Sequence, residues 1–423
     1  MLNNFKKIYK VLDSNKKKQF NLLILLMFFA AIFETVGIGS MLPLITYFTN
    51  ENFLISSNIY SNFFSDTSSL EGQKLLNIIL ISILVIYLIK NFYMILYGWL
   101  ESKFAYEVRF NLGVRLFKKY LNNKYLFHIE NNSSILMHKI MTETSFYGNA
   151  LISLSALITE SLIMFSIICF LIFIKPLETL IIVGIGFFLS LVFYFAIKNL
   201  VSKLGKKREF AQKSTMKSLN QGLGAIKDVM IYKVQDHFIK TFDTNSSNSA
   251  NASYKMYFLQ KLPRIWFEIM TISIITFVIF FLSLKAIETS SIMATIGVFL
   301  IATIRIIPSI NRILNSIQSI RFSRPAIDNI SGDLENNKDT QNQIPDDKKK
   351  LYSFKSDITF KNVTFKYPNT EKNTLDKLNF SIKKNQFVGI IGETGAGKST
   401  LVDLLMGLLK PEKGEITLDK KNI

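Results

Sequence analysis

The sequence predicts a mostly α-helical membrane protein with six spanning helices, followed by the first part of an α/β domain. Three observations predict this class. Hydrophobic residues make up 49% of the 423 residues, and the mean hydropathy is +0.27, which is too apolar for an ordinary soluble protein. Six apolar stretches are each long enough to cross a bilayer. After about residue 356, a strand-like alternation replaces the helical pattern.

The six spans follow from the length of a bilayer-spanning helix, which needs about 20 mostly apolar residues. The qualifying stretches are about 20–48, 75–98, 150–173, 177–198, 264–284 and 291–311. Lysine and arginine are abundant in the N-terminal segment and in the loops after the second and fourth spans, whereas each of the other three loops carries a single lysine. Because cytoplasmic loops carry the excess of basic residues, both termini are expected in the cytoplasm.

The strongly basic composition is explained by the same loops. The net charge is +19, and lysines that orient membrane helices account for it without a nucleic-acid partner. The single cysteine, Cys169, lies in an apolar run and cannot form a disulfide within the chain, while three scattered histidines offer no metal-binding spacing. The first apolar run is too long for the core of a cleavable signal peptide.

Two helices are expected to continue well beyond the bilayer. From Leu75 to about Asn122 no proline interrupts the pattern, so a continuous helix would be roughly 70 Å long at ~1.5 Å per residue. The bilayer core takes only about 30 Å of that length. The stretch from about 177 to 220 has the same property. Such extensions suit a protein that passes force from a cytoplasmic motor to its membrane part.

The composition changes after the last span. The stretch SGDLENNKDTQNQIPDDKKK, about 331–350, is polar and cannot bury a core, which indicates a linker. DITFKNVTFKY then alternates like a strand, and NQFVGIIG is predicted as a short apolar strand. The expected organisation is a six-helix domain at 1–330, a linker at 331–355 and part of an α/β domain at 356–423.

The motif GETGAGKST follows the predicted apolar strand and precedes the amphipathic stretch STLVDLLMGLL. It matches the phosphate-binding loop (P-loop) pattern G-x-x-x-x-G-K-[ST]. Its glycines let backbone N–H groups face phosphates, Lys398 reaches the β- and γ-phosphates, and the Ser399 hydroxyl ligates Mg²⁺. ATP and Mg²⁺ are therefore the expected cofactors. The predicted contacts are Gly392, Glu393, Thr394, Gly395, Ala396, Gly397, Lys398, Ser399 and Thr400.

The order of six spans, long loops, linker and P-loop resembles an ATP-binding cassette (ABC) exporter half-transporter. Tyr367, about 25 residues before Gly392, matches the aromatic residue that stacks on adenine in that family. A tyrosine at a strand edge is the alternative, because aromatic residues are common in strands. The resemblance also implies coupling helices near 125–133 and 225–236 that dock on the motor domains. A single six-span half implies a homodimer.

Several motifs of that family do not occur in these 423 residues, namely the glutamine loop, the signature sequence, the second acidic motif with its catalytic glutamate, and the switch histidine. Without them no group orients water and no acidic partner assists Mg²⁺. We expect the catalytic residues beyond Ile423, in a longer gene product with ATPase and translocase activity. The 423-residue chain alone is expected to be unable to hydrolyse ATP.

The sixth predicted span carries two arginines, although an arginine at the centre of a membrane helix costs on the order of 3 kcal/mol. Arg305 and Arg312 lie on one small-and-polar helix face, and Lys90 and Arg264 lie at similar depth. The four cations form a candidate ring that binds an anionic headgroup, because guanidinium offers phosphate a bidentate fork. Snorkelling of these side chains to the inner membrane surface is the alternative.

The stretches FETVGIGSMLPLI, LPRIWFE and IRIIPSINRI resemble bacterial lipid-linked oligosaccharide flippases. In that family, arginines that line the cavity engage the pyrophosphate of a polyprenyl-linked glycan. Arg264, Arg305 and Arg312 fall at matching positions, and Lys90 replaces an expected arginine, which keeps the charge but loses the fork. The resemblance also implies a short external helix, for which 51–64 is the candidate segment.

An ATP-driven flippase that moves polyprenyl-pyrophosphate-linked saccharides across the bacterial inner membrane is therefore the leading expectation. An ABC exporter of lipids, drugs or peptides has the same architecture. A truncated, non-catalytic ATP-binding subunit, with a genuine end after Ile423, is the alternative of another class. Glu34 and Glu268 lie in apolar runs, where an acid is either functional or paired with a nearby cation.

Overall fold

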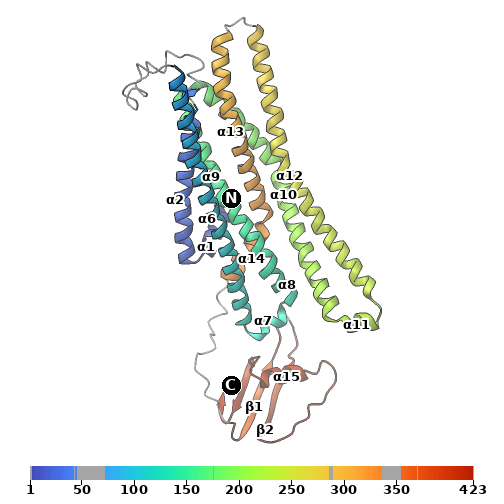
Figure 1. Ribbon diagram of the computed structural model, residues 1–423. Coiled ribbons are helices and arrows are strands. Elements are labelled where there is room, and N and C mark those ends of the chain that lie inside the picture. Colours follow the sequence, from blue (N-terminus) through green and yellow to red (C-terminus); the bar gives the residue numbers. More distant parts are fainter. Residues whose placement is uncertain are drawn as a thin grey trace. The chain divides into compact units, whose positions relative to one another are not determined.

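The computed structural model describes residues 2–41, 43–44, 72–174, 176–284, 289–335, 354–368 and 370–422 (Figure 1). The chain forms two compact units. The helical unit comprises Met1–Val114 and His138–Glu335, and the sheet unit comprises Arg115–Met137 and Asn336–Ile423. A segment between the second and third predicted spans thus belongs with the C-terminal residues.

Most of the described chain is helical, as the sequence predicts. The helices are α1 (Leu2–Val11), α2 (Ser14–Gly39), α6 (Gly72–Leu121), α7 (Tyr125–Glu130), α8 (Ser133–His138), a π-helical turn (Lys139–Glu143), α9 (Thr144–Ile174), α10 (Pro176–Gly224), α11 (Ile226–Ile231), α12 (Gln235–Leu284), α13 (Thr289–Phe322), α14 (Arg324–Glu335) and α15 (Lys398–Leu405). The two segments predicted as coupling helices contain α7 and α11.

Four described helical stretches are long and apolar enough to cross a membrane, namely Ser14–Gly39, Leu76–Leu121, Ser133–Phe173 and Val183–Gly224. They overlap the first four predicted spans, and α12 and α13 contain the fifth and sixth. The first span was predicted to extend to residue 48, but α2 ends at Gly39. The low helix propensity of this glycine and the nearby Pro43 both favour the end of the helix at this point. Residues 45–48 and the candidate external helix at 51–64 lie outside the described residues.

One face of α6 is apolar and exposed within the predicted second span. Four of its large exposed side chains are Leu84, Leu88, Phe92 and Ile95. They recur at spacings of three and four residues, so they form one stripe on the helix. A continuous exposed apolar stripe of this kind is typical of contact with lipid or another protein.

The long helical extensions predicted for the second and fourth spans are confirmed as continuous helices. α6 has 50 residues and α10 has 49, which corresponds to roughly 75 Å each at ~1.5 Å per residue. α10 runs beside α12 (Figure 1). The helices α10, α12 and α13 share a buried cluster beyond the predicted spans, made of Val201, Leu204, Ala252, Met256, Leu259 and Phe322.

α14 extends five residues into the segment predicted as a linker. Ile327 and Ile330 are buried, and three acids of this helix form ion pairs with lysines of other elements, among them Glu335 with Lys10 at 3.1 Å. Lys7 lies 2.5 Å from Asp328, and Lys139 lies 2.8 Å from Asp333. These contacts explain why polar residues stay helical up to Glu335. Residues 336–353 lie outside the described residues.

The sheet unit contains four antiparallel strands in the order β2-β1-β3-β4. They are β1 (Asp357–Phe365), β2 (Leu375–Lys383), β3 (Lys413–Leu418) and β4 (Lys421–Asn422). Its core contains Phe360, Val363 and Leu404 of α15. Phe360 stacks on Phe380 with a centroid distance of 4.4 Å. Leu126 of α7 packs against this core.

The apolar strand predicted at 385–392 is not formed. The segment leads into the P-loop without pairing to any strand in the described part of the chain. Phe387 is 99% exposed and Ile391 is 97% exposed. A strand is assigned through its ladder of backbone hydrogen bonds, and this segment finds none of the neighbours that such an apolar run needs.

Candidate functional site

The P-loop bends through two glycines in the left-handed region of backbone conformation. Gly395 has φ +90° and Gly397 has φ +87°, and Gly397 immediately precedes α15. A Cβ atom on Gly397 would lie 2.9 Å from Leu375 Cδ2 and 3.0 Å from the carbonyl oxygen of Thr374. Glycine is therefore required there both for its backbone conformation and for space.

Replacing Gly397 with alanine is expected to weaken ATP binding by roughly 10-fold or more, because the strained conformation costs about 1–3 kcal/mol. The matched control is Gly389→Ala. Gly389 lies eight residues earlier, its φ lies outside the left-handed region, and a Cβ atom added there would meet nothing within 4 Å. Calorimetric titration with ATP and Mg²⁺ measures both affinities. Equal affinities for the two variants would contradict the assigned role of Gly397.

Lys398 places its ammonium group inside the curve of the loop. Its Nζ donates to the carbonyl oxygens of Gly392 at 2.6 Å and of Glu393 at 2.7 Å. The side chain of Ser399, the next residue, is exposed. A cation, a hydroxyl and the N-terminus of α15 thus meet at one point, and this donor set suits a phosphate chain with bound Mg²⁺.

Tyr367 lies beside the P-loop helix. Its hydroxyl is 3.1 Å from Thr400 Oγ1, and its ring meets Phe365 edge-on at 5.0 Å. Tyr367 follows the end of β1, so it stands outside the ladder of that strand. The tyrosine and the P-loop, about 25 residues apart in sequence, are therefore neighbours in one site.

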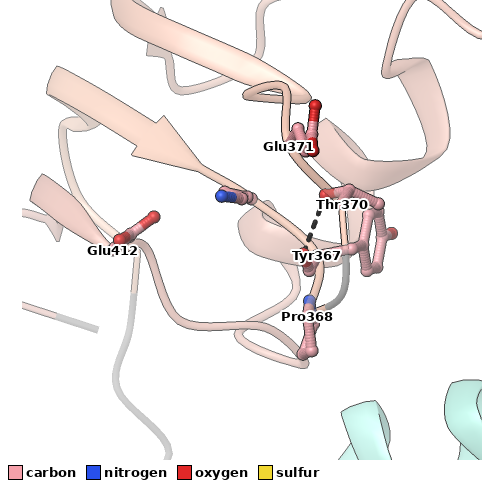
Figure 2. A pocket seen from close by; sticks show the side chains of 6 residues that line it. Tyr367, Pro368, Thr370, Glu371 and Glu412 are labelled. Atoms are coloured by element: carbon pink, nitrogen blue, oxygen red, sulfur yellow. Dashed lines mark hydrogen bonds between the residues drawn. The ribbon is translucent and has the colours of Figure 1, made fainter.

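An open cavity of about 550 Å³ borders this tyrosine (Figure 2). The side chains around the cavity include both positively and negatively charged groups. Thr370 Oγ1 donates a hydrogen bond to the carbonyl oxygen of Tyr367 at 2.8 Å. The cavity is lined by Lys366, Tyr367, Pro368, Thr370, Glu371 and Glu412. Its volume lies within the range of small-molecule sites, about 300–1,000 Å³.

Lys90 and Arg312, two of the four candidate substrate cations, are paired with acids of other helices. Lys90 Nζ on α6 lies 3.0 Å from Glu34 Oε1 on α2, and both side chains are largely buried. Arg312 Nη1 on α13 lies 2.6 Å from Glu160 Oε1 on α9. The Arg312 side chain is still 56% exposed, so part of its guanidinium stays available to another anion.

The other two cations lie on α12 and α13. Arg264 is exposed and follows Pro263, which lies inside α12. Arg305 lies within α13, and only the backbone of that residue belongs to the described part of the chain. Glu268, one turn after Arg264, is exposed. The cationic ring as a binding site stays a prediction.

A buried ionisable cluster outside the predicted spans was missed by sequence reasoning. His138, Glu143 and Arg208 are all fully or almost fully buried. In sequence, each has at least one charged or hydroxyl-bearing neighbour and cannot be told from a surface side chain. Only the folding of α10 against α9 brings them together, so no local pattern could have indicated the cluster.

Two family models match this chain. The model described as the ABC transporter transmembrane region matches residues 28–307, and the model described as ABC transporter matches residues 375–423. The first match covers more than half of the chain and contains most of the predicted spans. The second contains the P-loop and the strands β2 and β3.

Individual relatives divide into two groups by the share of the chain that they match. The chain is 26% identical to the ATP-dependent lipid A-core flippase of Blochmanniella pennsylvanica and 22% identical to that of Pseudoalteromonas atlantica, over 77% and 76% of the chain. It is 40% identical to the Beta-(1-->2)glucan export ATP-binding/permease protein of Bartonella henselae over 20% of the chain. The chain spans 54% of the length of each flippase and 14% of that exporter.

Proposed function

This chain belongs to the ABC transporter family, and from that premise we propose that it is part of an ATP-driven flippase. The cargo would be a polyprenyl-pyrophosphate-linked saccharide, moved across the bacterial inner membrane. The observation that carries the proposal is the pair of arginines on α13, within and directly after a predicted span, in a chain that also contains a P-loop. The relatives named lipid A-core flippase support a lipid-linked cargo in general terms.

The nucleotide site would hold ATP between Tyr367 and the P-loop. Lys398 and the backbone N–H groups of the loop would bind the phosphates, and Ser399 would ligate Mg²⁺. When bound, ATP would supply the terminal phosphoryl group, and the transfer of that group to water would release the free energy for transport. We expect residues 1–423 on their own to bind ATP without hydrolysing it, since they lack the acidic motif that would assist Mg²⁺ and the base that would orient water.

The cargo site would use cations at the inner half of the membrane. Arg264, Arg305 and Arg312 offer bidentate forks to a pyrophosphate. Lys90 joins them only if the pyrophosphate competes with Glu34 for its ammonium group, because that pair is buried and 3.0 Å apart. Two copies of the chain would be needed to enclose such a cavity, so a homodimer with cytoplasmic termini is proposed.

The function is tested by ATPase stimulation of the purified full-length transporter in lipid nanodiscs. A polyprenyl-pyrophosphate-linked saccharide is expected to raise the ATP turnover, because cargo that fills the cationic site favours the state that hydrolyses ATP. The neutral polyprenol and a cationic drug of similar size are the matched controls. Stimulation by the drug or by a peptide, but not by the pyrophosphate lipid, would favour the second candidate, a general ABC exporter.

The same assay separates transport from a non-catalytic role. A non-catalytic subunit would bind ATP with Mg²⁺ but show no turnover with any cargo, even as the full-length protein. Measurable basal turnover that disappears in the Lys398→Ala variant would exclude that role. The Lys398 ammonium is the group that reaches the terminal phosphates, so its loss affects nucleotide chemistry directly.

A further inference from the structure

The buried cluster of His138, Glu143 and Arg208 has no function in the proposed transport or nucleotide sites. The three side chains come from α8, the π-helical turn and α10, and all lie in the helical unit outside the predicted spans. Arg208 and Glu143 are 0% exposed and His138 is 1% exposed. Charged groups are almost never fully buried unless they are paired.

The distances within this cluster are slightly too long for hydrogen bonds. Glu143 Oε1 lies 3.7 Å from His138 Nε2 and 3.8 Å from Arg208 Nη2. Within the described structure, hydrogen-bond partners are absent for both carboxylate oxygens of Glu143, both ring nitrogens of His138 and all three guanidinium nitrogens of Arg208. Such spacings leave each polar atom close to a partner but unsatisfied, which costs free energy in a dry interior.

Aromatic rings hold Arg208 in place of hydrogen bonds. Its guanidinium carbon lies 3.3 Å from the centroid of Phe146 on α9 and 5.2 Å from that of Phe322 on α13. The backbone of α10 approaches α13 closely here, since a Cβ on Gly205 would lie 2.5 Å from the carbonyl oxygen of Phe322. The cluster is therefore the point where α9, α10 and α13 meet.

The π-helical turn Lys139–Glu143 is what turns Glu143 inward. It joins α8 to α9, and Thr144 Oγ1 donates to the carbonyl oxygen of Ile140 at 2.5 Å at its end. A π turn inserts one extra residue into a helix and rotates the side chains that follow. Such turns occur frequently at functional sites. A buried acid at the end of this turn is therefore a candidate functional residue.

Other charged groups face the cluster from three elements. Glu209 and Lys213 lie on α10 and form an ion pair of 3.6 Å. Lys139, on the π-helical turn, is paired with Asp333 of α14. Asn329 Nδ2 of α14 donates to Glu209 Oε1 at 2.9 Å. These groups satisfy one another, so none of them compensates Glu143 by a direct contact that the structure describes.

Burial sets the protonation of the cluster. Desolvation raises the pKa of Glu143 to about 7, although Arg208 works against this shift. Desolvation lowers the pKa of His138 to about 4, and the positive charge of Arg208 acts in the same direction. Desolvation also lowers the pKa of Arg208, to about 10, so its guanidinium keeps its charge at neutral pH. Near neutral pH only Glu143 changes its charge.

We infer that Glu143, Arg208 and His138 form a proton-operated joint between α9, α10 and α13, closed while Glu143 carries a proton and opened to water when it loses that proton. The closed joint gives the carboxylate no hydrogen bond, so ionisation is compatible only with a state in which water reaches it. Between about pH 4.5, the ordinary pKa that Glu143 regains when water reaches it, and the closed-state pKa of about 7, each pH unit shifts the closed–open equilibrium about tenfold toward the open state. Above about pH 7 both states have lost the proton, so the shift levels off. The joint would thus couple cytoplasmic pH to the separation of these helices.

The ionisable groups of the cluster make the free energy of unfolding depend on pH. Glu143 has a folded pKa of about 7 against an ordinary value of 4.5, so its favourable contribution is present at low pH and is lost as pH rises through about 7. His138 has a folded pKa of about 4 against an ordinary value of 6.5, so it contributes the opposite slope between those two values. The slopes of Glu143 and His138 oppose each other below about pH 6.5. Above that pH the slope of Glu143 adds to that of Glu101 on α6, whose pKa burial also raises to about 7.

The test is a distance measurement by spin labelling of the full-length protein in nanodiscs. Labels at the exposed positions Met141 and Phe210, in a Cys169→Ala background, report the separation of the π-helical turn from α10. From about pH 5 to about pH 7, a longer distance is expected to gain population, and the gain is expected to level off above about pH 7. Glu143→Gln, which cannot ionise, is expected to keep the short distance throughout.

The matched control is Glu209→Gln, which removes an acid of α10 next to Arg208 that is in partial contact with solvent. This variant is expected to retain the pH-dependent distance change. A pH-dependent change that persists in Glu143→Gln, or one that is absent from the unmodified protein, would overturn the inference. The labels report helix separation rather than transport, so the result does not depend on the cargo.

Discussion

Replacing Glu34 with alanine is expected to destabilise the helical unit by about 3–5 kcal/mol, since it leaves the Lys90 ammonium buried without its partner. The two groups lie 3.0 Å apart, and the side chains are 3% and 11% exposed, respectively. Both residues fall within predicted spans, where water offers little compensation. Denaturant unfolding in detergent, followed by circular dichroism, measures the change in the free energy of unfolding.

Two further variants calibrate that measurement. The double variant Glu34→Gln with Lys90→Met removes both charges and is expected to recover much of the lost stability, because replacing a whole buried pair is often neutral. Asp328→Ala breaks the ion pair with Lys7, whose side chains are 37% and 36% exposed, and is expected to cost only about 0–1 kcal/mol. Equal losses for Glu34→Ala and Asp328→Ala would mean that the intramembrane pair has no special role.

Reversing the charge at Arg305 is expected to abolish binding of the pyrophosphate cargo. Losing one partner of a desolvated charge pair costs about 2–5 kcal/mol, or roughly 30-fold or more in affinity, and glutamate adds repulsion. The expected phenotype is the loss of cargo-stimulated ATP turnover while ATP affinity stays unchanged. Fluorescence titration with the cargo and calorimetric titration with ATP separate these two quantities in one preparation.

The control for Arg305→Glu is Arg324→Glu on α14. Arg324 is 57% exposed, lies outside the predicted spans and pairs only loosely with Asp328, at 3.5 Å. It changes the net charge by the same amount, so a general electrostatic effect on the protein would appear in both variants. Cargo stimulation that survives Arg305→Glu would remove the strongest support for an anionic cargo and leave a general exporter.

Much of the helical architecture could be predicted because its causes are local. α6 and α10 end within a few residues of their predicted limits, since uninterrupted apolar periodicity without proline determines a long helix. The apolar strand at 385–392 failed for the opposite reason. A strand needs neighbours to pair with, and apolar composition cannot show whether a neighbour is present. α14 is stabilised by Lys7 and Lys139, both distant in sequence.

In the candidate site, too, local sequence motifs could be predicted, whereas contacts between residues distant in sequence could not. The P-loop is a contiguous motif, so its glycines, Lys398 and Ser399 could be identified from spacing alone. The place of Tyr367 at the nucleotide site was expected only through a family resemblance, and its contact with Thr400 was not predicted. The partner of Lys90 could not be chosen from sequence, because Glu34 lies 56 residues away on another helix. The burial of Arg208 depends on three helices meeting, which no local pattern encodes.

The most direct test of the proposed function is a translocation assay in proteoliposomes that contain the full-length transporter. A fluorescent polyprenyl-pyrophosphate-linked saccharide is placed in both leaflets, and its accessibility to a membrane-impermeant quencher is followed over time. The proposal predicts that ATP with Mg²⁺ changes the leaflet distribution of this lipid, and that Lys398→Ala and Arg305→Glu both prevent the change. An unchanged distribution in the presence of ATP, from a transporter that hydrolyses ATP normally, would contradict it.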